Sequence, residues 1–244
     1  MNQWLPVSPC DTGCVTDQRP ALPSSAAAGR VVRMLGALAA PGQDRASRVL
    51  NALGIRLHAN TKLLSAAPGT LVVANHVSWL DLIALNAVEP LVPLAKREVA
   101  AWPVIGGMAR RGGAVFIDRG NLRALPGTVA ELAAVLRSGR SVLVFPEGTT
   151  WCGRRTGRFH TAAFQAALDA GALVRPVSVR YTQAGQPSTV AAYLGSDSLL
   201  SSLARVAHAR DLAVRVTAHP VVRADNRREL ARAAWTSVSE LARV

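Results

Sequence analysis

The sequence has few of the residues that characterise several common classes of protein. Only three of its 244 residues are cysteines, too few and too scattered for a disulfide framework. Aromatic residues make up 5%, and there is no zinc-finger or RNP-type motif, which argues against nucleic acid as a partner. Charged residues make up 18% and hydrophobic residues 50%, which excludes a wholly disordered or coiled-coil chain.

The sequence also has no apolar run that is long enough to cross a bilayer. The most apolar stretch, 63–80, is interrupted by Pro68, Gly69, Asn75 and His76. Residues 1–18 have neither the basic region nor the apolar region of a signal peptide, so we expect none. Any action on a membrane would therefore take place without an obvious spanning segment.

Acidic residues and lysines are scarce, whereas arginine is abundant. Lys and Arg total 28 against 15 Asp and Glu, a formal net charge of +13, and Lys62 and Lys96 are the only lysines. Because guanidinium groups bind phosphates and carboxylates in a planar, bidentate way, we expect anionic partners. Nucleic acid, anionic lipid and a phosphorylated small molecule all satisfy this expectation.

The cysteines give little indication of a metal site. Cys10 and Cys14 have a spacing that occurs in zinc sites, but no second Cys/His pair follows at a suitable distance. We therefore expect Cys10, Cys14 and Cys152 to be free thiols in a reducing compartment. The five histidines are too dispersed to suggest a metal ion, so no metal and no cofactor is predicted.

Three regions differ in their patterns. Residues 1–25 are rich in Pro, Ser and Gly and predict a flexible tail. Helical spacing over 26–40 and 43–58, with a Pro-Gly break between them, predicts a hairpin of two basic, apolar-faced helices spanning 26–58. Such a hairpin could dock on an anionic membrane surface or pack on its own domain, and the pattern leaves both alternatives open.

Strand-like and helical segments alternate in the third region, 59–244. We expect strands at 70–74, 91–95, 114–117, 141–145, 172–180 and 214–218, and helices at 122–137, 160–170 and 227–244. Apolar strands that alternate with helices indicate an α/β fold with a largely parallel sheet flanked by helices. In such a sheet the chemistry usually lies beyond the carboxyl ends of the strands.

Polar clusters follow several of these strands. After 70–74 come Asn75, His76 and, five residues beyond the histidine, Asp81. The carboxylate could accept a hydrogen bond from Nδ1–H of His76 and leave Nε2 free to take a proton from a hydroxyl, although a surface histidine near a helix N-terminus is the alternative. The other clusters are Phe116-Ile-Asp-Arg119, Phe145-Pro-Glu-Gly-Thr149 with its following arginines, and Val174-x-Pro-Val177, where the proline suggests an edge strand or a bulge.

In this order, the four clusters resemble the glycerolipid acyltransferase superfamily, which includes the 1-acylglycerol-3-phosphate O-acyltransferases. The resemblance covers about 70–179 and implies His76 as catalytic base and Asp81 as its orienting partner. It also implies an acyl carrier protein or coenzyme A thioester as donor, a lysolipid as acceptor, and a peripheral position on the cytoplasmic face of the membrane. Members of the family have an N-terminal element for the membrane, so the resemblance favours membrane docking as the role of the hairpin over 26–58. The substrate-binding residues that we expect are Asn75, Arg119, Glu147, Gly148, Thr149, Arg154, Arg155 and Arg158.

The acceptor is where the sequence departs from the phosphate-acceptor pattern. Thr150 and Trp151 follow the Phe-Pro-Glu-Gly-Thr block, where many members have Arg or Ser. This form resembles the branch that contains lyso-ornithine lipid acyltransferases, so lyso-ornithine lipid and lysophosphatidate both stay open. An acyl-thioester hydrolase, and a catalytically silent membrane- or nucleic-acid-binding protein, are the rival interpretations of the whole pattern.

Overall fold

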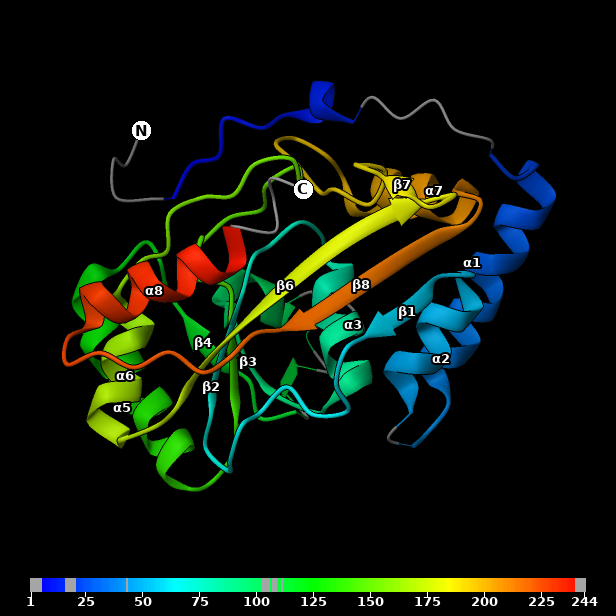
Figure 1. The fold of residues 1–244 in the computed structure, drawn as a ribbon. Helices are drawn as coiled ribbons and strands as arrows, with labels where there is room; N and C mark the ends of the chain where they lie inside the picture. Colours follow the sequence, from blue (N-terminus) through cyan, green and yellow to red (C-terminus); the bar gives the residue numbers. More distant parts are fainter. Residues whose placement is uncertain are drawn as a thin grey trace.

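The computed structural model describes residues 6–15, 21–42, 44–101, 106, 109–110 and 112–239, and a sheet runs through its centre (Figure 1). Its strands are β1 (Arg56–Ala59), β2 (Leu71–Ala74), β3 (Val92–Lys96), β4 (Val115–Ile117), β5 (Val142–Val144), β6 (Val174–Gln183), β7 (Gln186–Pro187) and β8 (Leu212–Ala218). The α-helices are α1 (Ser24–Ala39), α2 (Arg45–Ala52), α3 (Leu80–Val88), α5 (Leu125–Arg137), α6 (Ala162–Ala170), α7 (Leu199–His208) and α8 (Arg227–Ser239). Short 3-10 helices are η1 (Thr12–Cys14), η2 (Arg97–Ala101) and η3 (Leu122–Ala124).

The strand order is β1-β8-β6-β2-β5-β3-β4, and β7 pairs with β6. In the run β6-β2-β5-β3-β4 every neighbouring pair is parallel, and β1 and β8 are parallel to each other. The pair β6–β8 is antiparallel. The predicted α/β fold with a largely parallel sheet is therefore confirmed, and the carboxyl ends of β2, β3, β4, β5 and β6 meet at one edge.

Two hydrophobic cores cover the two faces of this sheet. Alternate residues of β2 face opposite sides: Leu71 and Val73 pack with α5, α6 and α8, whereas Val72 and Ala74 pack with α2 and α3. A strand with all four residues buried is what a central, doubly covered strand requires. This double burial explains the continuous apolar runs of the sequence.

The prediction of a second hairpin helix over 43–58 is wrong at its carboxyl end. Helix α2 ends at Ala52, and Gly54 follows with φ +71°, so that the N–H of Ile55 returns to the carbonyl of Leu50 at 2.9 Å. This is a glycine-based helix end. The chain then forms β1, which pairs in parallel with β8 and makes the sheet begin before residue 59.

Pro176 does not mark an edge strand or a bulge. Strand β6 lies inside the sheet, between β2 and β8. The pairing with β8 begins at Val177 opposite Ala218, so Pro176 lies where β8 has already ended. Its carbonyl accepts a hydrogen bond from the N–H of His219 at 2.9 Å. Because β8 has no residue paired with Pro176, the N–H that proline lacks removes no hydrogen bond between β6 and β8.

The described part of the predicted flexible tail packs on the domain. Residues 6–15 (blue in Figure 1) run across the molecule above the sheet, and Cys10 is 6% exposed within the larger core. Ala21 forms an isolated β-bridge with Ala209. Among the described residues, no helix has both the length and the apolar character needed to cross a bilayer.

Candidate active site

His76 and Asp81 lie together directly after β2. The strand ends at Ala74, and α3 begins at Leu80, so the residues between them form the turn that brings Asp81 back to the histidine. Nδ1 of His76 is 2.9 Å from Oδ2 of Asp81. The histidine side chain is 24% exposed and that of Asp81 is fully buried. The predicted pair is therefore formed, with one side of the imidazole open to solvent.

The carboxylate of Asp81 accepts hydrogen bonds from two backbone N–H groups and one hydroxyl. The backbone N–H groups of Val77 and Ser78 donate to Oδ2 at 2.6 and 2.9 Å, and the hydroxyl of Tyr181 donates to Oδ1 at 2.6 Å. Burial beside Asp81 raises the pKa of Tyr181 well above its usual value, so this hydroxyl keeps its proton. The ring of Phe145 stacks on His76 with centroids 4.1 Å apart. The imidazole is thus fixed by both an edge and a face.

Glu147 connects the loop after β5 to the loop after β2. One of its carboxylate oxygens accepts from the backbone N–H of His76 at 2.5 Å, and the other accepts from Gly157 at 2.7 Å. The N–H of Trp151 donates to the carbonyl of His76 at 2.8 Å. Both backbone groups of the histidine are therefore held by the 147–157 loop. Sequence reasoning placed Glu147 beside the acceptor, whereas the structure buries it as a brace, 2% exposed.

Burial also changes the proton affinity of this brace. Desolvation, partly offset by its two N–H donors, raises the pKa of Glu147 from 4.5 to about 8. At neutral pH the carboxyl group therefore keeps its proton in most molecules. A neutral carboxyl group beside His76 leaves Asp81 as the anionic partner of the imidazole.

Arg119 follows β4 and reaches the same turn. Its guanidinium donates to the carbonyl of Gly148, and burial lowers its pKa from the usual value. Gly148 has φ +74°, and its N–H donates to the carbonyl of Phe145 at 3.1 Å. This N–H is therefore committed to the turn. Arg119 therefore contacts Gly148 of this turn, whereas Glu147 accepts from the N–H groups of His76 and Gly157.

The remaining predicted residues take different positions around this centre. The amide of Asn75 donates to the carbonyl of Val179 at 3.0 Å and accepts from its N–H at 2.8 Å, which joins the end of β2 to β6. Thr149 is half-buried in the turn after Glu147. For both residues, a contact with substrate stays a prediction.

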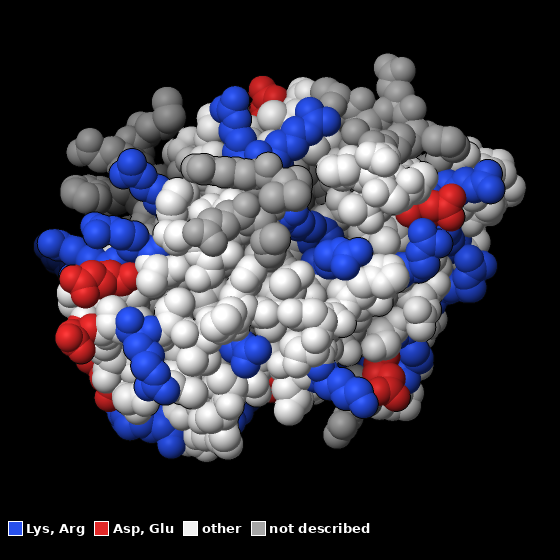
Figure 2. All heavy atoms as spheres, in the orientation of Figure 1, with Lys and Arg blue, Asp and Glu red and all other residues white. Residues whose placement is uncertain are grey.

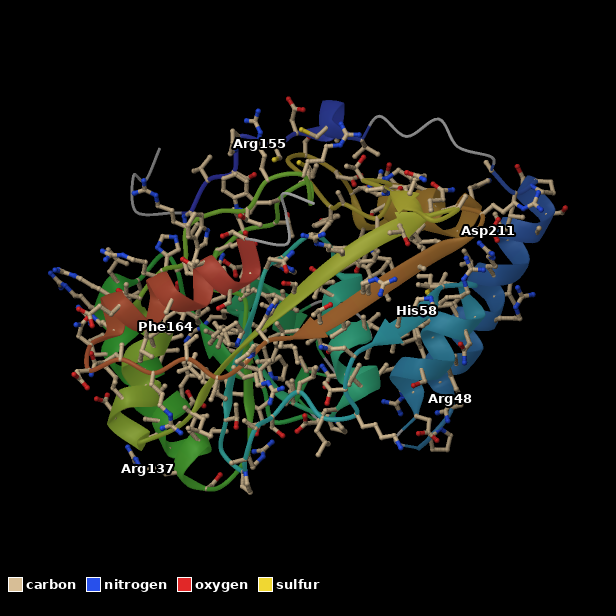
Figure 3. The ribbon with its side chains drawn as sticks, viewed as in Figure 1. Arg48, His58, Arg137, Arg155, Phe164 and Asp211 are labelled. Atoms are coloured by element: carbon tan, nitrogen blue, oxygen red, sulfur yellow. The ribbon has the colours of Figure 1, made fainter. Side chains whose placement is uncertain are left out.

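The three arginines of the 147–157 loop and its continuation are exposed. Arg154 and Arg155 line a depression of about 340 Å³ together with Cys10, Cys14 and Cys152. Arg155 lies beside the N-terminal segment in Figure 3, and Arg158 follows Gly157. Figure 2 shows Lys and Arg side chains across the visible face of the molecule, with few acidic ones between them. The exposed arginines at 154, 155 and 158 can therefore attract an anion, whereas Glu147 and Trp151 of the same loop hold His76.

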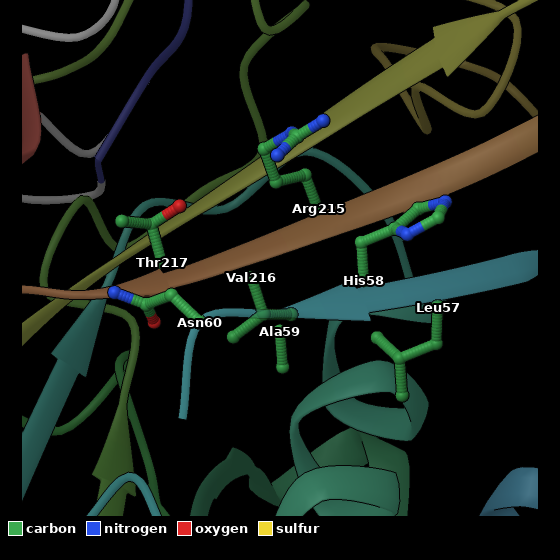
Figure 4. A pocket seen from close by; sticks show the side chains of 7 residues that line it. All are labelled: Leu57, His58, Ala59, Asn60, Arg215, Val216 and Thr217. Atoms are coloured by element: carbon green, nitrogen blue, oxygen red, sulfur yellow. The ribbon is translucent and has the colours of Figure 1, made fainter. Parts of the chain in front are cut away.

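A second pocket, of about 370 Å³, lies elsewhere on the sheet (Figure 4). Its walls come from β1 and β8, and two strands, β8 and β6, separate β1 from β2. We assign this pocket no part in the chemistry of His76. Its lining residues are Leu57, His58, Ala59, Asn60, Arg215, Val216 and Thr217.

Tyr181, Phe145 and Trp151 are the site residues that sequence reasoning missed. Tyr181 ends a buried stretch of β6, and a buried tyrosine hydroxyl needs a hydrogen-bond partner. That requirement was the available signal, but only the pairing of β6 with β2 shows that the partner is Asp81.

Comparison with known proteins assigns the chain to a family. Residues 55–180 match the family model described as Acyltransferase, which covers half of the chain. The chain belongs to this family. The matched segment begins just before β1 and includes His76, Asp81, Arg119 and Glu147, and it ends one residue before Tyr181.

Named relatives of this Acyltransferase chain are of two kinds. It is 44% identical over 136 residues to the lyso-ornithine lipid O-acyltransferase of Pseudomonas aeruginosa. This match covers 55% of the chain and 52% of the relative. It is 38% identical over 168 residues to the 1-acyl-sn-glycerol-3-phosphate acyltransferase of Neisseria meningitidis, which covers 69% of this chain and 66% of the relative. The chain thus spans about half of the first protein's length.

The fold is similar to that of a solved acyltransferase. The crystal structure of the 1-acyl-sn-glycerophosphate acyltransferase PlsC from Thermotoga maritima superposes with a TM-score of 0.60. The match covers 87% of this chain and 86% of the other, at 18% sequence identity. This similarity confirms the fold.

Proposed function

We propose that this protein is a lysolipid O-acyltransferase, which moves a fatty acyl group from a thioester to the hydroxyl of a lysolipid. The observation that carries the proposal is the 2.9 Å contact between Nδ1 of His76 and the buried carboxylate of Asp81, in an Acyltransferase domain. This contact fixes the proton on Nδ1 and leaves Nε2 as a hydrogen-bond acceptor on the exposed side of the ring.

In the proposed reaction, Nε2 of His76 takes the proton of the lysolipid hydroxyl while the oxygen attacks the thioester carbonyl. Asp81 stabilises the imidazolium that forms, as a carboxylate does in other base–orienter pairs. When the tetrahedral intermediate collapses, the C–S bond breaks, and the imidazolium returns its proton to the leaving thiolate. The products are the acylated lipid and the free thiol of the carrier, and the thioester requires no metal ion for its activation.

The proposed donor is acyl carrier protein or coenzyme A in its acylated form, and the proposed acceptor is lyso-ornithine lipid or lysophosphatidate. Relatives named for each of these acceptors support both. The exposed arginines at the tip of the 147–157 loop suit the carboxylate of one head group or the phosphate of the other.

We further propose that α1 docks on the anionic, cytoplasmic face of a membrane. Val32 and Leu35 lie three residues apart on one face of α1 and are 68% and 54% exposed, with Arg33 exposed between them. Apolar side chains beside cations are typical of helices that lie on anionic lipid. Helix α2 does not offer a comparable docking surface, because its apolar residues Val49 and Leu50 are buried in the core of the domain. Of the two alternatives for the hairpin, packing thus holds for α2 and docking is proposed for α1.

An assay of acyl transfer tests the reaction and separates it from thioester hydrolysis. We expect His76→Ala to lower turnover about 100-fold or more, the usual contribution of a general base. His58→Ala is the matched control, because His58 lies on β1, away from Asp81, and should leave turnover unchanged. Circular dichroism would verify that both variants fold.

Two outcomes would contradict the proposal. If His76→Ala kept more than about a tenth of the wild-type turnover, the histidine would not be the base. If the thioester were consumed at the same rate with and without lysolipid, and released free fatty acid, the protein would be a hydrolase.

A further inference from the structure

All three cysteines of the chain converge on one place. The sulfur atoms of Cys10, Cys14 and Cys152 lie within 4.8 Å of one another, although 138 residues separate Cys14 from Cys152. Two of the three are buried and Cys14 is half-buried. The sequence showed no further metal ligand near Cys10 and Cys14. The fold brings one to them, Cys152 of the 147–157 loop.

The backbone holds two of these thiols in a defined turn. Cys10 precedes η1 and Cys14 is its last residue; the N-terminus of η1 is capped by Asp11, whose carboxylate accepts from Gly13 N–H at 2.9 Å. The N–H of Cys14 returns to the carbonyl of Asp11 at 3.0 Å. Cys152 comes from the opposite side, directly after Trp151, whose N–H is bound to the carbonyl of His76. The cluster therefore joins the N-terminal segment to the loop that holds the catalytic histidine.

We propose that Cys10, Cys14 and Cys152 form a binding site for a thiophilic metal ion, for which Zn²⁺ is the appropriate probe. Four ligands at a Zn–S distance of about 2.3 Å stand roughly 3.8 Å apart in a tetrahedron, so these sulfurs need to move by at most about an ångström. The depression of about 340 Å³ beside the cluster leaves room for water as a fourth ligand.

The charges around the cluster are consistent with thiolate ligands. Binding releases the three thiol protons to solvent, and Zn²⁺ with three thiolates carries one net negative charge. Arg154 and Arg155 line the same depression and supply positive charge against that anion. An apolar pocket for three neutral thiols would not need two arginines at its mouth.

The bound ion would fasten residues 6–15 across the active-site loop. Pro6, in that segment, lies so close to Gly148 that a Cβ on this glycine would be 2.5 Å from the proline Cγ. Gly148 is also the residue whose carbonyl receives Arg119. Metal binding should therefore order the segment that covers the turn between Arg119 and His76. This inference concerns binding and does not depend on which acyl acceptor the protein uses.

Equilibrium binding to the full chain tests the site. Reduced, metal-free protein would be titrated with Zn²⁺ against a chromophoric chelator, and with Co²⁺ for its sulfur-to-metal charge-transfer band. We expect one ion per chain and protection of all three thiols from a thiol reagent. Cys14→Ser, at the half-buried position, should weaken binding at least about 100-fold, more than loss of an outer-shell partner does. Thr12→Ala, which changes exposed η1 and keeps the thiols, is the control.

Three results would overturn the proposal. In the first, the thiols react with the thiol reagent equally fast with and without Zn²⁺. In the second, the Cys14→Ser variant binds Zn²⁺ as tightly as the wild type does. In the third, the protein under non-reducing conditions has a mass two hydrogens lower than expected, which would show a disulfide. The thiol-protection measurement needs no variant, so a misfolded substitution cannot leave the question open. Limited proteolysis near residues 6–15, slowed by Zn²⁺ in the wild type only, would confirm the fastening separately from activity.

Discussion

At the scale of single residues, two carboxyl groups beside His76 have opposite tasks. Asp81 accepts hydrogen bonds from the histidine ring, from two backbone N–H groups and from the Tyr181 hydroxyl. Glu147 receives two backbone N–H groups and stays mostly protonated because burial raises its pKa to about 8. The sequence predicted Asp81 as the orienting carboxylate but assigned Glu147 to substrate binding, because the bracing role of Glu147 arises from its burial.

Glu147 should therefore make stability depend on pH. Its unfolded-state pKa is near 4.5 and its folded-state pKa is about 8, so between these values the folded protein holds a proton that the unfolded chain has lost. The stabilisation is complete below pH 4.5 and is lost as pH rises through 8. We expect the free energy of unfolding to fall by about 1.4 kcal/mol per pH unit in this window through this group alone.

The measurement compares urea unfolding of the wild type and Glu147→Gln from pH 5 to pH 8. Gln imitates the protonated carboxyl group, so the variant should lack this part of the slope. Glu131→Gln, an exposed position on α5, is the control and should follow the wild type. Parallel curves for the wild type and Glu147→Gln would contradict the prediction.

At the scale of secondary-structure elements, α1 and α2 show why a pattern of apolar and basic residues does not reveal its partner. Both helices have that pattern, yet α2 packs into the core and α1 keeps Val32 and Leu35 exposed. Arg30, which the pattern assigns to solvent or lipid, instead donates to the carbonyls of Ala207 and Ala209 at 3.1 and 2.7 Å. Deleting 1–58 would remove α2 and β1 with α1, so point substitutions are the better test of docking.

We expect Val32→Ser with Leu35→Ser to weaken binding to anionic vesicles about tenfold or more, because burying one Val or Leu side chain contributes about 1.5 kcal/mol. Flotation with phosphatidylglycerol-containing vesicles measures the partition. Leu122→Ser is the matched control: it also removes an exposed leucine, 48% exposed, but on η3 beside α5. Equal partition of the double variant and the control would place the docking surface outside α1.

At the scale of the whole molecule, the sequence predicted most strands of the sheet and left their order undetermined. The elements it missed had local signals: Gly54 ends α2, and Ser198 caps α7 by accepting from Ser201 N–H at 3.1 Å. Other features have no local signal. The bond from Tyr181 to Asp81 and the approach of Cys152 to Cys10 join residues that are 100 or more positions apart, and only the three-dimensional fold brings them together.

The whole arrangement bears on the choice of acceptor. Glu147 is not placed to bind the amine of an ornithine head group, because it is buried and accepts from the N–H groups of His76 and Gly157. The arginines at the loop tip serve a carboxylate or a phosphate equally well in charge. The choice between acceptors therefore depends on the 44% identity, over 136 residues, to the lyso-ornithine lipid O-acyltransferase of Pseudomonas aeruginosa.

On this ground we expect lyso-ornithine lipid to be the better acceptor. The measurement is kcat/KM for lyso-ornithine lipid and for lysophosphatidate with one donor, in the same detergent. A common donor makes the ratio a difference in transition-state binding between the two head groups. A tenfold preference for lysophosphatidate, about 1.4 kcal/mol, would reverse the expectation while leaving His76 as the base, since both acceptors present a hydroxyl to the same Nε2.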